Sequence, residues 1–327
     1  MSLYGAVDLG GTTVKAAIAD RAGRVLTQGA IPTDSHQGPE AVVERIADFV
    51  LRLAREANDS QGTDATLAGL GIGAPGLVDV TTGATLFLPN LPTQWRGVSV
   101  GTRLTERLGC RVRLLNDVRM ATLGELRFGH GRELPNVTMA FFSIGTGIGG
   151  GVAVEGRLRL GPLGAAGELG HQTILPNGPR CGCGNQGCLE ALASGPAIAG
   201  EGVRLLRSGL APRLHELVQG DAGRVTPREM LTAAEAGDEL VRDVIDRAAE
   251  YLGIAAANTA TTLHPDLIVL GGGVAELGDV LLRRVRAVVA QRVKMFPAES
   301  VRIERSQLGE RAGIMGAVAL AHEAAGA

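Results

Sequence analysis

The chain has 327 residues, of which 45% are hydrophobic, so it can form one large or two medium-sized globular domains. Its net charge is −2 and it has no long basic run, which argues against nucleic acid as a partner. It also has no apolar run long enough to span a bilayer, which argues against a membrane. The opening residues "MSLYGAVDLGG" lack the regions of a secretory leader, and the four cysteines, three of them crowded, do not resemble a disulfide framework, so we expect a cytoplasmic protein.

The first part of the chain predicts an α/β domain that opens with three strands. Apolar stretches separated by turn residues, with Gly23 in one turn, indicate an antiparallel meander. Apolar residues at helical spacing from Val43 to Leu51 indicate a helix, and a later apolar strand ends at Asn116-Asp117. The predicted elements are strands at 3–8, 14–19, 24–30, 67–71 and 112–115, a helix at 40–56, and a helix that ends at 128.

The second part repeats this opening and then becomes mainly helical. The order of strand, glycine-threonine loop and strand occurs twice, which predicts two similar α/β halves facing each other across a cleft. We expect a smaller domain at 1–117, on which a C-terminal helix near 311–325 packs, and a larger domain at 118–327. The predicted elements are strands at 137–144, 152–154 and 267–270, glycine loops at 145–151 and 271–273, helices within 196–263, and a closing helix at 311–324.

The stretch "CGCGNQGCLE", residues 181–190, places three cysteines within eight residues. Cys181 and Cys183 are too close for an unstrained disulfide, whereas the thiolates of Cys181, Cys183 and Cys188, together with His171 of the upstream "GELGH", would form a four-coordinate structural zinc site. The alternatives are three free, reduced cysteines and a catalytic zinc, but four protein ligands leave a catalytic ion no open position. The second ring nitrogen of His171 would need a partner, which could be a substrate hydroxyl.

Two glycine loops are candidates for binding phosphate. The first, "DLGGT" at 8–12, joins two strands, unlike the strand-to-helix glycine turn of a dinucleotide site, and it lacks the lysine of a P-loop. Its backbone N–H groups and threonine hydroxyls could still converge on phosphate, and Asp8 could hold a magnesium ion through water. The second, "SIGTGIGGG" at 143–151, is a similar glycine-threonine turn between two strands, although each loop by itself could be an ordinary turn.

Three carboxylates are candidates for acid–base or hydroxyl-binding work. Asp117 follows a strand and precedes a helix, so it could be a general base or simply the N-cap of that helix. Glu168 lies three residues before His171, and Glu190 lies two residues after Cys188. A zinc ion bound nearby would therefore hold both glutamates in place, which suits the recognition of a polyol. The alternative is that both are ordinary surface carboxylates.

These motifs together carry a family resemblance. "DLGGT", "SIGTGIGGG" and "VLGGGV" resemble the actin-like, hexokinase-type ATPases, and "GELGH" followed by "CGCGNQGCLE" resembles the signature of the ROK family. The resemblance extends from residue 3 to about residue 325. It implies an α/β protein with two ribonuclease H-like domains around an interdomain cleft, and an ATP-dependent hexose kinase that uses Mg²⁺ and a structural Zn²⁺.

The resemblance also implies a role for each motif residue. Asp117 matches the catalytic base. The sugar ligands implied are Asn90, Asn116, Asp117, Glu168, His171 and Glu190. The nucleotide ligands implied are Asp8, Gly10, Gly11 and Thr12 in the first phosphate motif, Thr146 and Gly147 in the second, and Gly272 and Gly273 in the adenosine motif. The zinc ligands implied are His171, Cys181, Cys183 and Cys188.

The expected reaction is the phosphorylation of glucose at its 6-hydroxyl. Kinases for mannose, fructose, N-acetylglucosamine or N-acetylmannosamine share the hydroxyl ligands, so they stay open as alternatives, as does a non-catalytic sugar-binding regulator. Repressor members of the family carry a DNA-binding domain ahead of the first strand, which begins here at about residue 3. Thr12 and Thr13 match users of ATP better than users of polyphosphate. The resemblance further implies a homodimer or homotetramer.

Overall fold

The computed structural model describes residues 2–326, which form two compact units. Unit 1 consists of residues 2–135, 156–166 and 307–326, and Unit 2 consists of residues 136–155 and 167–306. Unit 1 contains a five-stranded sheet and Unit 2 contains four strands of a second sheet, each with helices packed on it, so the prediction of two α/β domains is confirmed.

The sheet of Unit 1 has the strand order β3-β2-β1-β4-β7. The predicted meander of β1, β2 and β3 is antiparallel, and β4 and β7 then add in parallel on the other side of β1. A two-stranded hairpin, β5 with β6, was not predicted. The strands are β1 (Ser2–Leu9), β2 (Thr13–Ala19), β3 (Val25–Pro32), β4 (Thr66–Ala74), β5 (Leu77–Asp79), β6 (Ala84–Phe87) and β7 (Arg111–Asn116).

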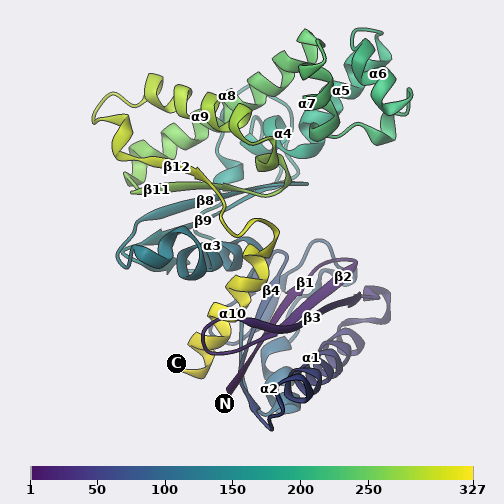
Figure 1. Ribbon diagram of the computed structural model, residues 1–327, viewed down its shortest axis with the longest axis vertical. Coiled ribbons are helices and arrows are strands. Elements are labelled where there is room, and N and C mark those ends of the chain that lie inside the picture. The colour runs from purple at the N-terminus through teal and green to yellow at the C-terminus, as the bar shows by residue number, and fades with distance from the viewer. Residues whose placement is uncertain (1, 327) are drawn as a thin grey trace. The chain divides into compact units, whose positions relative to one another are not determined.

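Four helices cover the two faces of this sheet. α1 and α2 lie on one face, where the buried side of α1 packs against apolar strand residues such as Leu70 and Ile72. α3 and α10 lie on the other face, toward which Gly71 and Gly73 point (Figure 1). The helices are α1 (Pro39–Gln61), α2 (Val100–Leu108), α3 (Asp117–Phe128) and α10 (Ala312–Ala325).

The C-terminal helix α10 packs unusually close to the sheet and to α3. A Cβ atom on Gly71 would lie 2.1 Å from the carbonyl oxygen of Ala317, and one on Gly316 would lie 1.7 Å from that of Met120. Glycine at these two positions lets the backbones approach, and alanine at Gly71 would cost about 1–3 kcal/mol through overpacking. α10 therefore belongs to Unit 1.

Unit 1 also extends further along the chain than the boundary expected after residue 117. α3 follows that position, and it packs against β4, β7 and α10, so the first unit continues to Pro135. The boundary expected from the sequence lies just after a predicted strand, where the pattern of apolar residues changes from strand to helix. The packing of α3 depends instead on α10, which is distant in sequence.

The second sheet has the order β10-β9-β8-β11-β12 and repeats the topology of the first. β8 and β9 form an antiparallel hairpin, and β11 and β12 add in parallel on the other side of β8. The predicted repeat of strand, glycine loop and strand is therefore present in both sheets. The strands are β8 (Met139–Ile144), β9 (Ile148–Val154), β10 (Arg157–Arg159), β11 (Leu267–Gly271) and β12 (Arg302–Arg305), of which β10 and β12 were not predicted.

The glycine loop predicted at 145–151 is shorter in the structure. β9 begins at Ile148, and Gly149, Gly150 and Gly151 pair with Ser143, Phe142 and Phe141 of β8. A strand needs backbone N–H and C=O groups for its ladder and no side chains, so a run of glycines can continue the hairpin. Only residues 145–147 form the turn.

Unit 2 gathers its helices on its sheet around a core of alanine and branched aliphatic side chains (Figure 1). The long helix α8 buries residues at spacings of three and four, among them Val241, Val244, Ala248 and Leu252, and it packs against α9. The helices are α4 (Leu189–Ala193), α5 (Gly195–Arg207), α6 (Pro212–Val218), α7 (Pro227–Glu235), α8 (Glu239–Leu263) and α9 (Asp279–Arg292). No helix within residues 2–326 combines the length and the apolar character needed to cross a membrane.

Candidate functional site

The junction of β7 and α3 carries the predicted base. Asn116, and not Asp117, is the N-cap of α3, because its Oδ1 accepts hydrogen bonds from the backbone N–H groups of Val118 at 3.0 Å and Arg119 at 3.2 Å. Asp117 is the first helical residue, and its Oδ1 accepts the N–H of Val118 at 2.8 Å. None of the hydrogen bonds among residues 2–326 uses Oδ2 of Asp117. One carboxylate oxygen is therefore available to a ligand.

The surroundings of Asp117 make its carboxylate more basic than usual. The pKa of Asp117 is raised to about 6, chiefly by burial and also by the carboxylate of Asp8, while the hydrogen bond from Val118 and the guanidinium of Arg119 act to lower it. Burial also raises the pKa of Asp8, against the effect of Lys15, its register partner on β2. A carboxylate with a pKa near 6 is ionised at neutral pH and still accepts a proton readily, as a general base must.

The side chain of Asn116 is held by Unit 1 itself. Its Nδ2 donates to the carbonyl oxygen of Gly76 at 3.0 Å, and its Oδ1 accepts a third hydrogen bond from Nη1 of Arg119 at 3.1 Å. These bonds leave one N–H of the amide for a ligand, since a primary amide has two. Asn116 can therefore contact a sugar only through a donated hydrogen bond, in a fixed direction.

Arg119 is a functional candidate that the sequence reasoning missed. Only 2% of its surface is exposed, and its Nε donates to the carbonyl oxygen of Ala166 at 3.2 Å. The available signal was helical spacing, because position 119 shares a face with the buried Leu123 and Leu126. A buried arginine needs charged or polar partners, so its place beside Asn116 and Asp117 indicates a role in arranging them.

The first glycine loop is a tight turn closed by hydrogen bonds. The N–H of Gly10 donates to the carbonyl oxygen of Thr13 at 3.0 Å, and the hydroxyl of Thr33 donates to the carbonyl oxygen of Gly10 at 2.8 Å. A Cβ atom on Gly11 would lie 3.0 Å from the carbonyl oxygen of Asn90, so the structure brings Asn90 beside this loop. Thr12 is exposed at the turn, where its hydroxyl can reach a phosphate.

The second glycine loop, residues 145–147, is held from two sides. The N–H of Gly145 donates to the carbonyl oxygen of Gly147, and the N–H of Gly195 donates to that of Gly145, both at 2.8 Å. The N–H of Ile148 donates to Oε2 of Glu190 at 2.9 Å. Thr146 is exposed between these anchors, so its hydroxyl and the N–H groups of Thr146 and Gly147 are open to a ligand.

The predicted adenosine motif lies next to the same hairpin. Gly272 follows β11 with a φ of +83°, and a Cβ atom there would lie 2.5 Å from the carbonyl oxygen of Ile144, the last residue of β8. Glycine is required for both the backbone angle and the close approach. Gly273 begins a short 3-10 helix, and a Cβ atom there would have no neighbour within 4 Å. The second phosphate motif and the adenosine motif thus adjoin β8 within Unit 2.

The four predicted zinc ligands converge. One ligand atom from each of His171, Cys181, Cys183 and Cys188 lies within 4.8 Å of the others. Sγ of Cys181 is 3.6 Å from Nδ1 of His171, and Sγ of Cys183 is 3.7 Å from Sγ of Cys188. In a tetrahedral zinc site with Zn–S of about 2.3 Å and Zn–N of about 2.0–2.1 Å, the corresponding edges are about 3.6 Å and about 3.8 Å. The residues present therefore fit a zinc ion.

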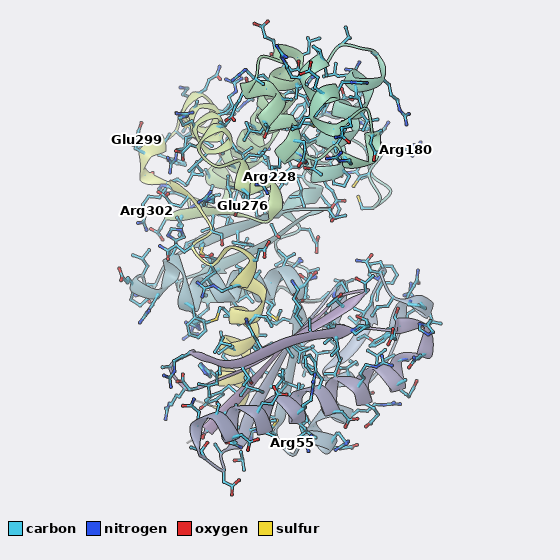
Figure 2. All side chains as sticks on the ribbon, turned by 45° about the vertical axis from the view of Figure 1, so that its right-hand side comes forward. Arg55, Arg180, Arg228, Glu276, Glu299 and Arg302 are labelled. Atoms are coloured by element: carbon cyan, nitrogen blue, oxygen red, sulfur yellow. The ribbon has the colours of Figure 1, made fainter. Side chains whose placement is uncertain are left out.

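The loop that carries the cysteines is shaped for this cluster. The N–H of Cys181 donates to the carbonyl oxygen of Asn185 at 2.8 Å, and Arg180 lies at the exposed rim of the loop (Figure 2). A Cβ atom on Gly187 would lie 1.6 Å from the carbonyl oxygen of Leu175, so the close approach of these two backbone segments requires glycine there. Burial, with the neighbouring cysteine thiols, raises the pKa of the Cys181 thiol to about 12, and a bound cation would stabilise its thiolate.

His171 separates the cysteines from Glu168. Its Nδ1 faces Cys181, and its Nε2 lies 3.8 Å from Oε2 of Glu168. The side chains of His171 and Glu168 are 32% and 42% exposed, so a ligand can reach both. Glu190 is partly buried, with Oε1 at 3.6 Å from Sγ of Cys181 and Oε2 on the second glycine loop.

The predicted site residues fall into two groups, one in each unit. Unit 1 holds Asp8, Gly10, Gly11, Thr12, Asn90, Asn116 and Asp117. Unit 2 holds Thr146, Gly147, Glu168, His171, Cys181, Cys183, Cys188, Glu190, Gly272 and Gly273. Within Unit 1 the first glycine loop adjoins Asn90, and Asp8 acts on Asp117 electrostatically. Within Unit 2 Glu190 joins the second loop to the cysteine cluster.

A separate cavity of about 450 Å³ lies in Unit 1 between α3, β7 and α10. Its lining combines leucines with Arg113, Arg127, Arg157 and Glu323, and it includes none of the predicted site residues. Glu323 pairs with Arg113 at 3.7 Å and with Arg127 at 3.5 Å, so its one negative charge offsets one of the three arginine charges.

Comparison with known proteins relates the whole chain to one family. The sequence profile of the ROK family matches residues 4–324. A glucokinase of Thermotoga maritima is 35% identical over 98% of this chain and 97% of its own, and an N-acetylmannosamine kinase of Shigella boydii is 31% identical over 97% of each. The crystal structure of a ROK family glucokinase from Streptomyces griseus, in complex with glucose and AMPPNP, has a TM-score of 0.79 at 31% identity. It covers 98% of this chain and 100% of that chain.

Proposed function

Because the chain belongs to the ROK family, we propose that it transfers the γ-phosphoryl group of ATP to the 6-hydroxyl of glucose, giving glucose 6-phosphate and ADP. The placement of Asp117 carries this proposal, since a basic carboxylate with an open oxygen lies at the start of α3. The full-length relative named glucokinase and the structure solved with glucose and AMPPNP support the choice of both substrates.

Asp117 is the base of the reaction. The proton of the sugar 6-hydroxyl passes to its carboxylate as the hydroxyl oxygen bonds to the γ-phosphorus and the bond from that phosphorus to the β–γ bridging oxygen breaks. Its neighbour Asn116 donates one amide hydrogen bond to the sugar, and Asn90 offers a second polar contact beside the first glycine loop. The base and these contacts all belong to Unit 1.

The phosphates are bound by the two glycine loops. Backbone N–H groups of Gly11, Thr146 and Gly147, with the hydroxyls of Thr12 and Thr146, direct donors to the phosphate oxygens, while the N–H groups of Gly10 and Gly145 close their own loops. Gly272 and Gly273 leave room for the adenosine. A bound Mg²⁺ would neutralise phosphate charge, and Asp8 is the residue that would hold it through water.

The cysteine cluster serves the sugar site as a structural support. His171, Cys181, Cys183 and Cys188 would hold Zn²⁺, which has no open coordination position once these four ligands are bound. Binding through Nδ1 leaves Nε2 of His171, with Glu168 beside it, to receive sugar hydroxyls. Glu190 completes the set of sugar ligands, because its carboxylate adjoins the same cluster.

A kinase for another hexose is the second candidate. The N-acetylmannosamine kinase from Shigella boydii is 31% identical to this chain, against 35% for the glucokinase, and the hydroxyl ligands would be shared. A non-catalytic sugar-binding regulator is less favoured, since it would need neither a basic Asp117 nor two phosphate loops.

The decisive experiment measures ATP consumption with a panel of hexoses. Specificity is a ratio of kcat/KM values, so each sugar is titrated separately, with glucose, mannose, fructose, N-acetylglucosamine and N-acetylmannosamine in the panel. We expect the highest kcat/KM for glucose. A higher value for another hexose would reassign the substrate, and no turnover with any of them would refute the kinase assignment.

A further inference from the structure

The carboxylate of Glu190 connects two parts of Unit 2. Oε2 accepts the N–H of Ile148 at 2.9 Å, immediately after the second glycine loop, and Oε1 lies 3.6 Å from Sγ of Cys181. A Cβ atom on Gly147 would lie 2.5 Å from Oε2, so the loop rests directly on this carboxylate. A single side chain therefore contacts both the loop and the cysteine cluster.

The same short stretch of chain holds the loop at both ends. Glu190 is in the first turn of α4 and binds the exit of the loop at Ile148, while Gly195, which begins α5, donates from its N–H to the carbonyl oxygen of Gly145 at 2.8 Å. The loop itself adds one internal hydrogen bond, from the N–H of Gly145 to the carbonyl oxygen of Gly147. Its shape thus depends on these few contacts, and within residues 2–326 Glu190 provides the one made by a side chain.

We propose that Glu190 is a positioning residue for the nucleotide: its carboxylate fixes the loop at 145–147 in the shape that receives ATP phosphates, in addition to binding the sugar. This inference rests on the proposed function, which makes that loop a phosphate site. Two substrates would then depend on one carboxylate within Unit 2. The coupling is reciprocal, so glucose must change the affinity for nucleotide by the same factor as nucleotide changes the affinity for glucose.

Charge and geometry predict opposite results when Glu190 is replaced. A carboxylate near bound phosphates repels them, so if its charge dominated, its removal would tighten nucleotide binding. If the hydrogen bond to Ile148 dominates, as we propose, alanine weakens binding, whereas glutamine keeps an acceptor oxygen for the same N–H. Glu190→Ala and Glu190→Gln therefore separate the two effects.

The experiment titrates AMPPNP with Mg²⁺ into the sugar-free full-length protein by calorimetry. We expect Glu190→Ala to weaken AMPPNP binding about tenfold, the effect of losing one hydrogen bond to a charged group, and Glu190→Gln to stay within about threefold of wild type. Glu168→Ala is the matched control, because this other predicted sugar ligand lies beside His171, so its removal should impair glucose binding and leave AMPPNP binding unchanged.

Three results would overturn the inference: wild-type AMPPNP affinity in Glu190→Ala, tighter binding in both Glu190 variants, or equal weakening in Glu168→Ala. Zinc content is measured in every variant. Should Glu190→Ala lose metal, Cys183→Ser becomes the reference, since it lacks a predicted zinc ligand and keeps Glu190. The proposal then requires weaker AMPPNP binding in Glu190→Ala than in Cys183→Ser, and equal affinities refute it.

The test also separates this inference from the proposed function. If the wild-type protein neither binds AMPPNP nor phosphorylates any hexose, the kinase assignment fails. If the wild type does both and Glu190→Ala binds AMPPNP equally well, only the positioning role of Glu190 fails.

Discussion

Nη1 of Arg119 donates a hydrogen bond to Oδ1 of Asn116 at 3.1 Å, so a buried arginine holds the amide that caps the helix bearing Asp117. The same guanidinium fixes the carbonyl of Ala166 and lowers the pKa of Asp117. Three features of the proposed sugar-phosphorylation chemistry in Unit 1 therefore depend on one side chain: the helix start, the sugar-contacting amide and the basicity of the carboxylate.

Replacing Asp117 by asparagine should abolish most of the turnover. The change keeps the shape of the side chain and removes the proton acceptor, so kcat should fall by roughly 10² or more, while the Kd for glucose stays nearly unchanged. A coupled ATP assay and calorimetry with glucose measure the two quantities. Asp64→Asn, at an exposed loop position, is the control, and wild-type turnover in Asp117→Asn would remove this residue from the mechanism.

The rate of the wild-type enzyme should depend on pH through Asp117. The carboxylate can accept a proton only when ionised, and its pKa is about 6, so kcat/KM should fall as the pH drops below about 6 and level off above about 7. A pH–rate profile at saturating Mg²⁺ checks this. A profile that stays flat down to pH 5 would contradict the role of Asp117 as base.

Replacing Arg119 by methionine should move that profile to higher pH. The guanidinium stabilises the Asp117 carboxylate and so lowers its pKa, and its removal raises the pKa and shifts the acid limb upward. We also expect kcat to fall about tenfold or more with a smaller change in KM, since the first turn of α3 loses a hydrogen bond. Arg119→Lys keeps the charge and should leave the acid limb in place. If Arg119→Met and Arg119→Lys give the same pH–rate profile, the charge of Arg119 does not affect the pKa of Asp117.

Replacing Cys183 by serine should remove zinc and weaken sugar binding together. Without the ion His171 loses the bond that would fix its ring with Nε2 toward a ligand, so we expect the KM for glucose to rise about tenfold or more. Metal analysis and kinetics on the same preparations measure both effects. Cys110→Ser is the matched control, because Cys110 is the one cysteine outside the cluster. An active wild-type protein that contains no zinc would refute the ligand set.

His322 should make the stability of the protein depend on pH. Its ring packs edge-on against Tyr4 at 4.2 Å, and burial lowers its pKa below the usual 6.5. Between the folded pKa and 6.5 the unfolded chain binds more protons, so the free energy of unfolding falls as the pH drops through this window and is fully retained above it. Thermal melts of wild type and His322→Phe at pH 5 to 8 isolate this contribution. A wild-type Tm that falls no more than that of the variant would contradict it.

Local patterns determined the elements and motifs that the sequence could predict. The antiparallel meander, the long helix after it and the repeated strand–loop–strand arrangement follow from apolar spacing and turn residues, which act over a few positions. The set of His171, Cys181, Cys183 and Cys188 could be proposed for the same reason, since these residues lie within one short segment. Family resemblance then supplied the roles of residues, such as Asp117, for which the local reading left two interpretations.

Tertiary structure decided what depends on residues distant in sequence. Whether Arg119 is buried, how far the second glycine loop extends and which unit receives α10 depend on packing among segments that meet only in the folded chain. The hydrogen bond between Glu190 and Ile148 joins residues that no short-range pattern relates. The sequence alone therefore determined the chemical groups and most of their secondary structure. Burial and long-range hydrogen bonding decided which of those groups are held, charged or open to a ligand, because both arise only when the whole core has formed.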